Sequence, residues 1–272
     1  MPRASTDNPT LWFVGGPPLG GGVFADVQSR LGQGECRSVL DPDHAEDGWR
    51  ARGEALAGEI AAAGGNVVLI AHGLALPAAL VAAPAAAGLV LLNGPVSRLD
   101  PVTAAIARLA RLSPSLVAAS LLRAEVLLPW LASSAGLRRT VANPYVMDRD
   151  TVAALAASTV GSGLLRTATA SYLASLAVGL PDLSPIGVPT LVLWGDEDRL
   201  YPCSEADLLS VRSGGAPYQR LAGGRFLGVV ERPWEVAEKV TAFLSKSFPN
   251  APVATLVSQS APPRPARKRR SG

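Results

Sequence analysis

The sequence predicts an α/β protein in which helices flank a mostly parallel sheet and a helical segment interrupts the alternation. Short runs typical of β-strands alternate along the chain with segments of helical periodicity, the pattern of parallel strands joined by crossover helices. Several of these runs are almost continuously apolar, as expected for strands covered on both faces. The 272 residues are 48% hydrophobic, so one domain of this size can bury a large core.

Six segments are predicted as strands, in chain order Leu11–Val14, Cys36–Leu40, Asn66–Ala71, Gly88–Leu92, Thr190–Trp194 and Pro217–Leu221. Two amphipathic helices are predicted to pack on the sheet. Their apolar stripes consist of Trp49, Leu56, Ile60 and Ala63 in one and of Val236, Val240, Phe243 and Leu244 in the other. Pro233 precedes the second stripe, where its fixed φ suits the first turn of a helix.

The stretch between the fourth and fifth strands has helical patterns and no convincing strand. The predicted helices are Val102–Leu112, Ser113–Ala135, Asp148–Ser158 and Gly161–Gly179. The second is apolar enough to suggest a membrane segment, but Arg123, Glu125 and Pro129 interrupt it, so a lid or a buried helix fits better. The predicted organisation is therefore a core formed by residues 1–94 and 186–248, a helical cap at 95–185 and a tail at 249–272.

Composition limits the classes of function. The tail carries five basic residues, no acid and several prolines, so we expect it to be disordered and solvated. We find no motif of a specific nucleic-acid reader, and two cysteines, Cys36 and Cys203, form neither a metal motif nor a disulfide framework. The first ten residues lack the apolar region of a secretory signal, and no window has about 20 uninterrupted apolar residues, so we expect a soluble cytoplasmic protein without membrane insertion.

The segment VVLIAHGLALPAALVAA resembles the strand, turn and helix that carry the nucleophile in the α/β-hydrolase fold family. In that family the nucleophile stands at the centre of a tight turn between small residues. Here the turn is Ala71-His72-Gly73-Leu74-Ala75, so the flanking residues are small and the centre is Gly73. Glycine adopts positive φ without penalty, but it supplies no oxygen or sulfur for attack.

Two further segments are similar to the family's acid and base loops, and the resemblance spans residues 11–248. The run Trp194-Gly195-Asp196-Glu197-Asp198 puts Asp198 at the position of the acidic residue, and Gly224-Arg225-Phe226 puts Arg225 at the position of the catalytic histidine. The chain has only two histidines, His44 and His72, and neither follows the turn. Since arginine stays protonated near neutral pH, we predict that Arg225 forms an ion pair with Asp198 instead of moving protons.

The family's oxyanion hole is also expected to be altered. It combines the N–H after the nucleophile, here that of Leu74, with one from the loop after the first strand. Alignment of that loop puts Gly16 before Pro17 at the donor position, and proline has no N–H. The predicted ligand pocket consists of Gly16, Pro17, His72, Gly73, Leu74, Asp198 and Arg225. We predict no metal and no cofactor.

Two hypotheses about function follow from the resemblance. The first is a pseudohydrolase with a degenerate triad at Gly73, Asp198 and Arg225, which binds a small apolar or carboxylate-bearing molecule or a protein partner. The second is a lyase, isomerase or cyclase that uses the cap-covered pocket without a covalent nucleophile, with His72 or Asp198 as the proton carrier. We favour the first, because three parts of the machinery differ and no replacement set is visible. The sequence does not indicate the oligomeric state.

Overall fold

Six parallel strands form one sheet in the computed structural model, which describes residues 9–32, 34–144, 149–182 and 185–249. The strands are β1 (Thr10–Gly15), β2 (Glu35–Ser38), β3 (Val67–His72), β4 (Gly88–Leu92), β5 (Thr190–Gly195) and β6 (Tyr218–Leu221). Their order in the sheet is β2-β1-β3-β4-β5-β6. All six predicted strands are confirmed, with ends that differ by at most two residues. The predicted architecture, a parallel sheet flanked by helices, is therefore confirmed.

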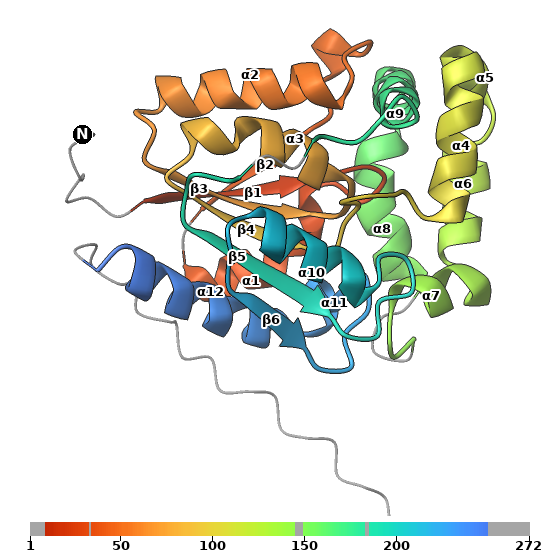
Figure 1. The fold of residues 1–272 in the computed structure, drawn as a ribbon. Helices are drawn as coiled ribbons and strands as arrows, with labels where there is room; N and C mark the ends of the chain where they lie inside the picture. Colours follow the sequence, from red (N-terminus) through yellow and green to blue (C-terminus); the bar gives the residue numbers. More distant parts are fainter. Residues whose placement is uncertain (1–8, 33, 145–148, 183–184, 250–272) are drawn as a thin grey trace, which may run out of the picture.

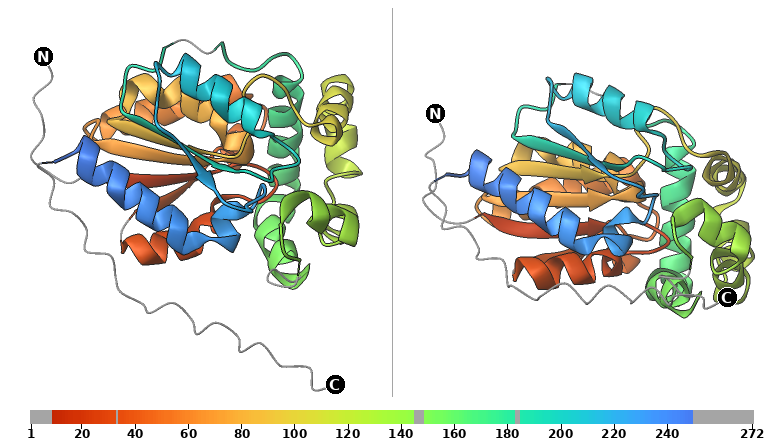
Figure 2. Two further views of the ribbon diagram at one scale, coloured as in Figure 1. Left: turned by 60° about the horizontal axis from the view of Figure 1, so that its bottom comes forward. Right: turned by 90° about the horizontal axis from the view of Figure 1, so that it is seen from below.

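Helices cover both faces of the sheet (Figures 1 and 2). On one face lie α2 (Trp49–Ala62), α3 (Leu76–Ala82) and α10 (Cys203–Arg212), and on the other lie α1 (Ala25–Leu31) and α12 (Pro233–Ser247), beside the short α11 (Gly228–Glu231). The predicted apolar stripes are buried except at Ala63, which is exposed because it caps the end of α2, and at Leu244, which is partly buried. Every residue of β3 is buried, which explains its unbroken apolar sequence.

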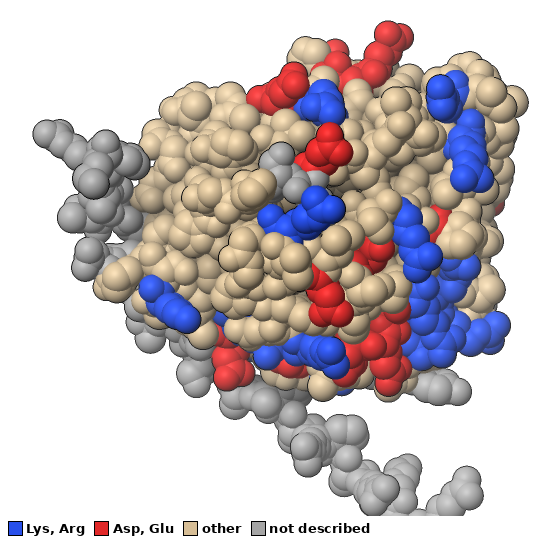
Figure 3. Space-filling view, in the orientation of Figure 1, with Lys and Arg blue, Asp and Glu red and all other residues tan. Residues whose placement is uncertain are grey.

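The chain between β4 and β5 packs beyond the carboxyl ends of the strands (Figure 1). We call this segment the helical insertion. Its helices are α4 (Pro101–Leu112), α5 (Pro114–Ala119), α6 (Ala124–Leu131), α7 (Ser134–Thr140), α8 (Arg149–Val160) and α9 (Gly163–Leu176). Figure 3 shows Lys and Arg side chains gathered over this side of the molecule, while most of the neighbouring surface is uncharged. Residues 250–272 of the predicted basic tail lie outside the described residues.

The prediction of one helix over Ser113–Ala135 is wrong. The segment contains α5 and α6 and the start of α7, with turns between them. The Ser120 hydroxyl donates to the Leu116 carbonyl at 2.6 Å where α5 ends. The Ser133 hydroxyl accepts from the Gly136 N–H at 3.1 Å and caps the next helix. Serine side chains compete in this way with the backbone hydrogen bonds of a continuing helix.

The order of the strands indicates where in the sheet a ligand would bind. The chain runs from β1 outward to β2 and then returns to β3 on the other side of β1, so the direction of winding reverses between β1 and β3. Ligands of open α/β sheets bind at the carboxyl ends of the strands beside such a reversal. Here the glycine-rich loop after β1 and the turn after β3 meet at this position, because a Cβ atom on Gly16 would lie 2.7 Å from the Leu74 carbonyl carbon. Only glycine permits this approach.

We predict that Leu69→Ala lowers the free energy of unfolding by about 2–5 kcal/mol, because Leu69 is fully buried in β3 and its loss leaves a cavity. Leu112→Ala is the matched control, since Leu112 is 83% exposed and its truncation should change stability by less than about 0.5 kcal/mol. Chemical denaturation followed by circular dichroism measures both. Equal losses in the two variants would contradict the placement of β3 at the centre of the core.

Candidate functional site

The turn after β3, residues 71–75, which we call the elbow, has a residue of positive φ at its centre, and that residue is a glycine. Gly73 has φ 62°, and its N–H donates to the Asn93 carbonyl at the end of β4 at 2.9 Å. A Cβ atom at this position would lie 3.0 Å from Cζ of Phe226. The aromatic ring of Phe226 therefore packs tightly against the position of a side chain at residue 73.

His72, the last residue of β3, is buried behind the elbow. Its Nε2–H donates to the Phe226 carbonyl at 2.8 Å, and the rings of His72 and Phe226 lie 4.6 Å apart. Burial lowers the pKa of His72 to about 4, although the hydrogen bond to Phe226 opposes this shift. The imidazole is thus neutral near pH 7, and its Nε2–H is already bonded.

Asp198 follows β5 and accepts hydrogen bonds on both carboxylate oxygens. Asn93 donates its amide to Oδ2 at 2.7 Å, and the N–H groups of Leu200 and Tyr201 donate to Oδ1 at 2.8 and 3.1 Å. Burial raises the pKa of Asp198 to about 6, while these donors favour the ionised form. Asn93 also accepts the Gly195 N–H through Oδ1 at 3.3 Å, so its side chain holds the loop after β5 in place.

The predicted ion pair between Asp198 and Arg225 is wrong. Among the described residues no cation lies within salt-bridge distance of Asp198, whose oxygens take N–H donors instead. Arg225 lies 3.6 Å from the carboxylate of Glu197 and donates through one terminal nitrogen to the carbonyls of Arg138 and Val141, at 3.0 and 2.8 Å. It therefore binds the carboxyl end of α7.

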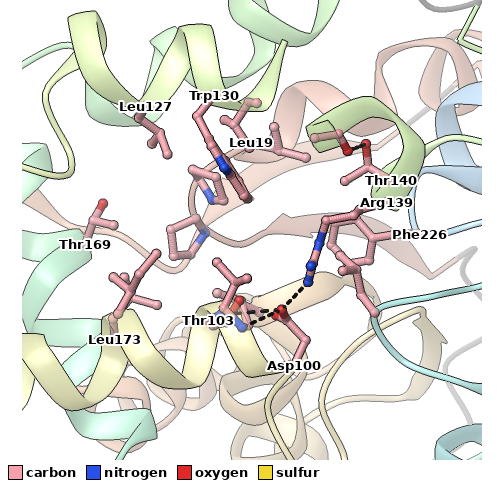
Figure 4. A pocket seen from close by; sticks show the side chains of 18 of the residues that line it. Leu19, Asp100, Thr103, Leu127, Trp130, Arg139, Thr140, Thr169, Leu173 and Phe226 are labelled. Atoms are coloured by element: carbon pink, nitrogen blue, oxygen red, sulfur yellow. Dashed lines mark hydrogen bonds and ion pairs between the residues drawn. The ribbon is translucent and has the colours of Figure 1, made fainter. Parts of the chain in front are cut away.

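A largely apolar pocket of about 110 Å³ lies between the strand ends and the helical insertion. Its lining consists of Pro17, Pro18, Leu19, Leu74, Asp100, Val102, Thr103, Ile106, Leu122, Leu127, Trp130, Leu131, Gly136, Arg139, Thr140, Thr169, Leu173, Leu200, Tyr201 and Phe226. Figure 4 shows Asp100, Arg139 and Thr103 close together at one end, whereas Leu127, Trp130 and Leu173 lie away from them. The pocket thus has a polar end, formed by the charged Asp100 and Arg139, and a largely apolar end, where the buried Thr169 hydroxyl has no hydrogen-bond partner among the described residues.

The structure brings only part of the predicted ligand set to this pocket. Pro17 and Leu74 line it, and Pro17 supplies no N–H beside Leu74. The other five predicted residues are not in its lining: Gly16, His72, Gly73, Asp198 and Arg225. Phe226 stands between several of them and the pocket, since its ring lines the wall and contacts His72.

Sequence reasoning missed the polar end of the pocket. Asp100 precedes Pro101 and accepts the N–H groups of Val102 and Thr103, so the sequence signal it carries is that of a helix cap. Arg139 lies 39 positions further along the chain, and its terminal nitrogen donates to Asp100 at 2.9 Å. A pair so distant in sequence leaves no motif from which the site could be inferred.

Neither a metal site nor a membrane-spanning helix is found in the part of the chain that the structure describes. No three His, Cys, Asp or Glu side chains gather there as metal ligands would. No helix in those ranges has the length and apolar composition needed to cross a bilayer.

Comparisons with known proteins identify the fold but no family. No protein-family model matches the sequence, and no curated protein matches it. Among solved structures, the chain is similar to an esterase from Thermogutta terrifontis with malate bound, at 19% identity and a TM-score of 0.65, over 89% of this chain and 91% of that one. It is similar to the haloalkane dehalogenase DbeA from Bradyrhizobium elkani, at 14% identity and a TM-score of 0.65, over 90% and 92% of the two chains.

A third similar structure is MenH from S. aureus, at 14% identity and a TM-score of 0.67, over 89% of this chain and 95% of that one. At these identities the likeness establishes the fold and not the reaction. Together with the strand order, it shows that the chain has the α/β-hydrolase fold.

We predict that Gly73→Ala lowers the free energy of unfolding by about 1–3 kcal/mol, because alanine is strained at φ 62° and its Cβ would press on Phe226. Gly58→Ala is the control. Gly58 lies in α2 with nothing within 4 Å of its Cβ position, so the same change should stabilise the protein by about 0.5–1 kcal/mol. Thermal and urea denaturation measure both effects, and a stabilising Gly73→Ala change would be inconsistent with the elbow geometry.

The buried His72 predicts a specific pH dependence. Its pKa of about 4 in the folded protein lies below the ordinary value of about 6.5, so the unfolded chain takes up the proton first on acidification. We predict that between pH 6.5 and pH 4 the wild type loses about 3 kcal/mol more stability than His72→Gln, whose amide can still donate to Phe226.

The difference between the two proteins isolates His72 from Asp198. The raised pKa of Asp198 acts in the opposite direction, because a carboxyl that is protonated more readily in the folded state gains stability as the pH falls through 6. Both proteins keep Asp198, so its contribution cancels in the difference. Urea denaturation at a series of pH values gives the two curves, and parallel curves would show that His72 is not buried as a neutral group.

Proposed function

We propose that this α/β-hydrolase-fold protein binds a small, largely apolar molecule in the pocket between its strand ends and its helical insertion, and that it does not act as a serine hydrolase. The contact between Phe226 and the elbow carries the proposal. The ring lies against the position where the fold would present a nucleophile, and it forms part of the pocket wall. A molecule in the pocket therefore meets an aromatic ring in place of a reactive hydroxyl.

His72 and the groups at the acid and base positions support binding rather than hydrolysis. His72 is neutral, and its Nε2–H already donates to a carbonyl. Asp198 accepts hydrogen bonds on both carboxylate oxygens. Arg225 donates to the carbonyls of Arg138 and Val141 at the carboxyl end of α7. General-base catalysis needs a group within hydrogen-bond reach of the substrate. His72 and Asp198, the proton carriers expected for a lyase, isomerase or cyclase, do not line the pocket, so we favour binding over that alternative.

The size of the pocket supports a small ligand. An apolar cavity of about 150 Å³ holds benzene in another protein, whereas drug-sized ligands occupy about 300–1,000 Å³. The 110 Å³ found here suits a molecule built on a single ring or a short alkyl chain. A protein that only binds a protein partner would need no internal pocket. We therefore favour binding of a small ligand over binding of a protein partner. Trp130 lines the pocket and is 42% exposed, so it lies where the pocket meets solvent.

Native mass spectrometry of freshly purified protein tests the proposal. We expect the wild type to carry a small apolar molecule, and Leu173→Trp, which fills the apolar end, to carry none. Leu164→Trp is the control, because Leu164 lies on the same helix, is 60% exposed and does not line the pocket, so this variant should still carry the molecule. We also expect no turnover of a p-nitrophenyl ester and no serine labelled by a fluorophosphonate. Turnover together with such a label would overturn the proposal.

A further inference from the structure

The polar end of the pocket presents one carboxylate oxygen that the protein does not use. Three donors share Oδ1 of Asp100: the N–H groups of Val102 and Thr103, at 3.1 and 3.4 Å, and Arg139 at 2.9 Å. All the hydrogen bonds found to the Asp100 side chain among the described residues are on Oδ1, and Oδ2 accepts none of them. The side chain is only 3% exposed, yet Asp100 lines the pocket. Oδ2 is not among the fully buried side-chain atoms without a partner, so it is open to the pocket, and a ligand with an N–H or O–H group can donate to it.

Arg139 places hydrogen-bond donors beside this acceptor. A guanidinium has five N–H groups, and only one terminal nitrogen of Arg139 bonds to Asp100 (Figure 4). The side chain is 35% exposed and lines the pocket, so further N–H groups can face a ligand. An acceptor and a donor thus stand side by side, and the ion pair that supplies them has no net charge.

We propose that the ligand is an uncharged molecule with an apolar body and a head group that both donates and accepts hydrogen bonds, such as an alcohol or a carboxamide. The head group donates to Oδ2 of Asp100 and accepts from Arg139. A carboxylate is attracted by Arg139 but repelled by Asp100, and an ammonium is attracted by Asp100 but repelled by Arg139, so neither ion recovers the free-energy cost of leaving water. The apolar body lies against Leu127, Trp130 and Leu173, away from Asp100. This inference rests on the proposed binding function.

A series of probes with one ring and different head groups tests the inference on the wild-type protein. The probes are benzamide, benzyl alcohol, benzoate, benzylamine and toluene, titrated at pH 7 and followed by protein NMR. We expect benzamide and benzyl alcohol to bind at least about tenfold more tightly than benzoate and benzylamine, and more tightly than toluene, which has no head group.

The outcomes separate the inference from the function on which it rests. If toluene binds as tightly as benzamide, or if either ion binds best, the pocket binds ligands but the head group is not selected as we propose. If none of the five probes binds, the proposed binding function fails with it.

Two substitutions should invert the preference. Asp100→Asn keeps a side-chain oxygen to cap α4 and leaves Arg139 unopposed, so benzoate should gain at least about tenfold in affinity. Arg139→Gln leaves Asp100 unopposed, so benzylamine should gain by a similar factor. Circular dichroism and the urea midpoint establish that each variant is folded.

Arg138→Gln is the matched control. Arg138 precedes Arg139 in α7 but is exposed and does not line the pocket. Its removal lowers the positive charge of the helical insertion, whose Lys and Arg side chains appear in Figure 3, and leaves the ion pair of Asp100 and Arg139 intact. We expect the order of the five probes to be unchanged. A shift toward benzylamine equal to that of Arg139→Gln would show that the general surface charge, and not the pair in the pocket, sets the preference.

Discussion

Three consecutive residues after β6 hold together the elbow, the sheet and the helical insertion. The Arg225 side chain donates to the carbonyls at the end of α7, and the Leu227 N–H donates to the Thr140 carbonyl at 2.8 Å. Between them, the Phe226 carbonyl accepts from His72 while its ring covers Gly73. One short loop therefore fixes the position of α7 and fills the space above the elbow. The wall of the pocket depends on both effects.

The chemistry of arginine explains why this residue suits that loop. The last carbonyls of a helix carry partial negative charge, so a cation near them is favourable. A guanidinium donates in several directions at once, and Arg225 reaches two carbonyls and approaches Glu197. A histidine has at most two N–H groups and could not make this set of contacts. On our proposal, Arg225 does not carry protons as a histidine at this position would. It instead connects the core to the helical insertion through its hydrogen bonds.

The fold could be predicted from the sequence, because apolar runs and turn residues depend mainly on local structure. The sequence identified β3 and Gly73, whose positive φ follows from the turn alone. Prediction from the sequence failed for contacts between residues that are far apart along the chain. Asp198 was expected to need a cation, but Asn93 and two adjacent backbone N–H groups satisfy it. The pairing of Asp100 with Arg139 and the contact of Phe226 with Gly73 likewise arise only from tertiary packing.

The source of the polar groups separates the pocket from the elbow. The elbow and acid positions follow strands of the sheet, whereas Asp100 and Arg139 both belong to the helical insertion. Strand ends are held by the hydrogen bonds of the sheet and by full burial, so they tolerate little change. Helices packed over the sheet can exchange side chains at lower cost to stability. If ligand choice depends on the insertion, as we propose, it can change without disturbing the core that the sheet and the loop after β6 maintain.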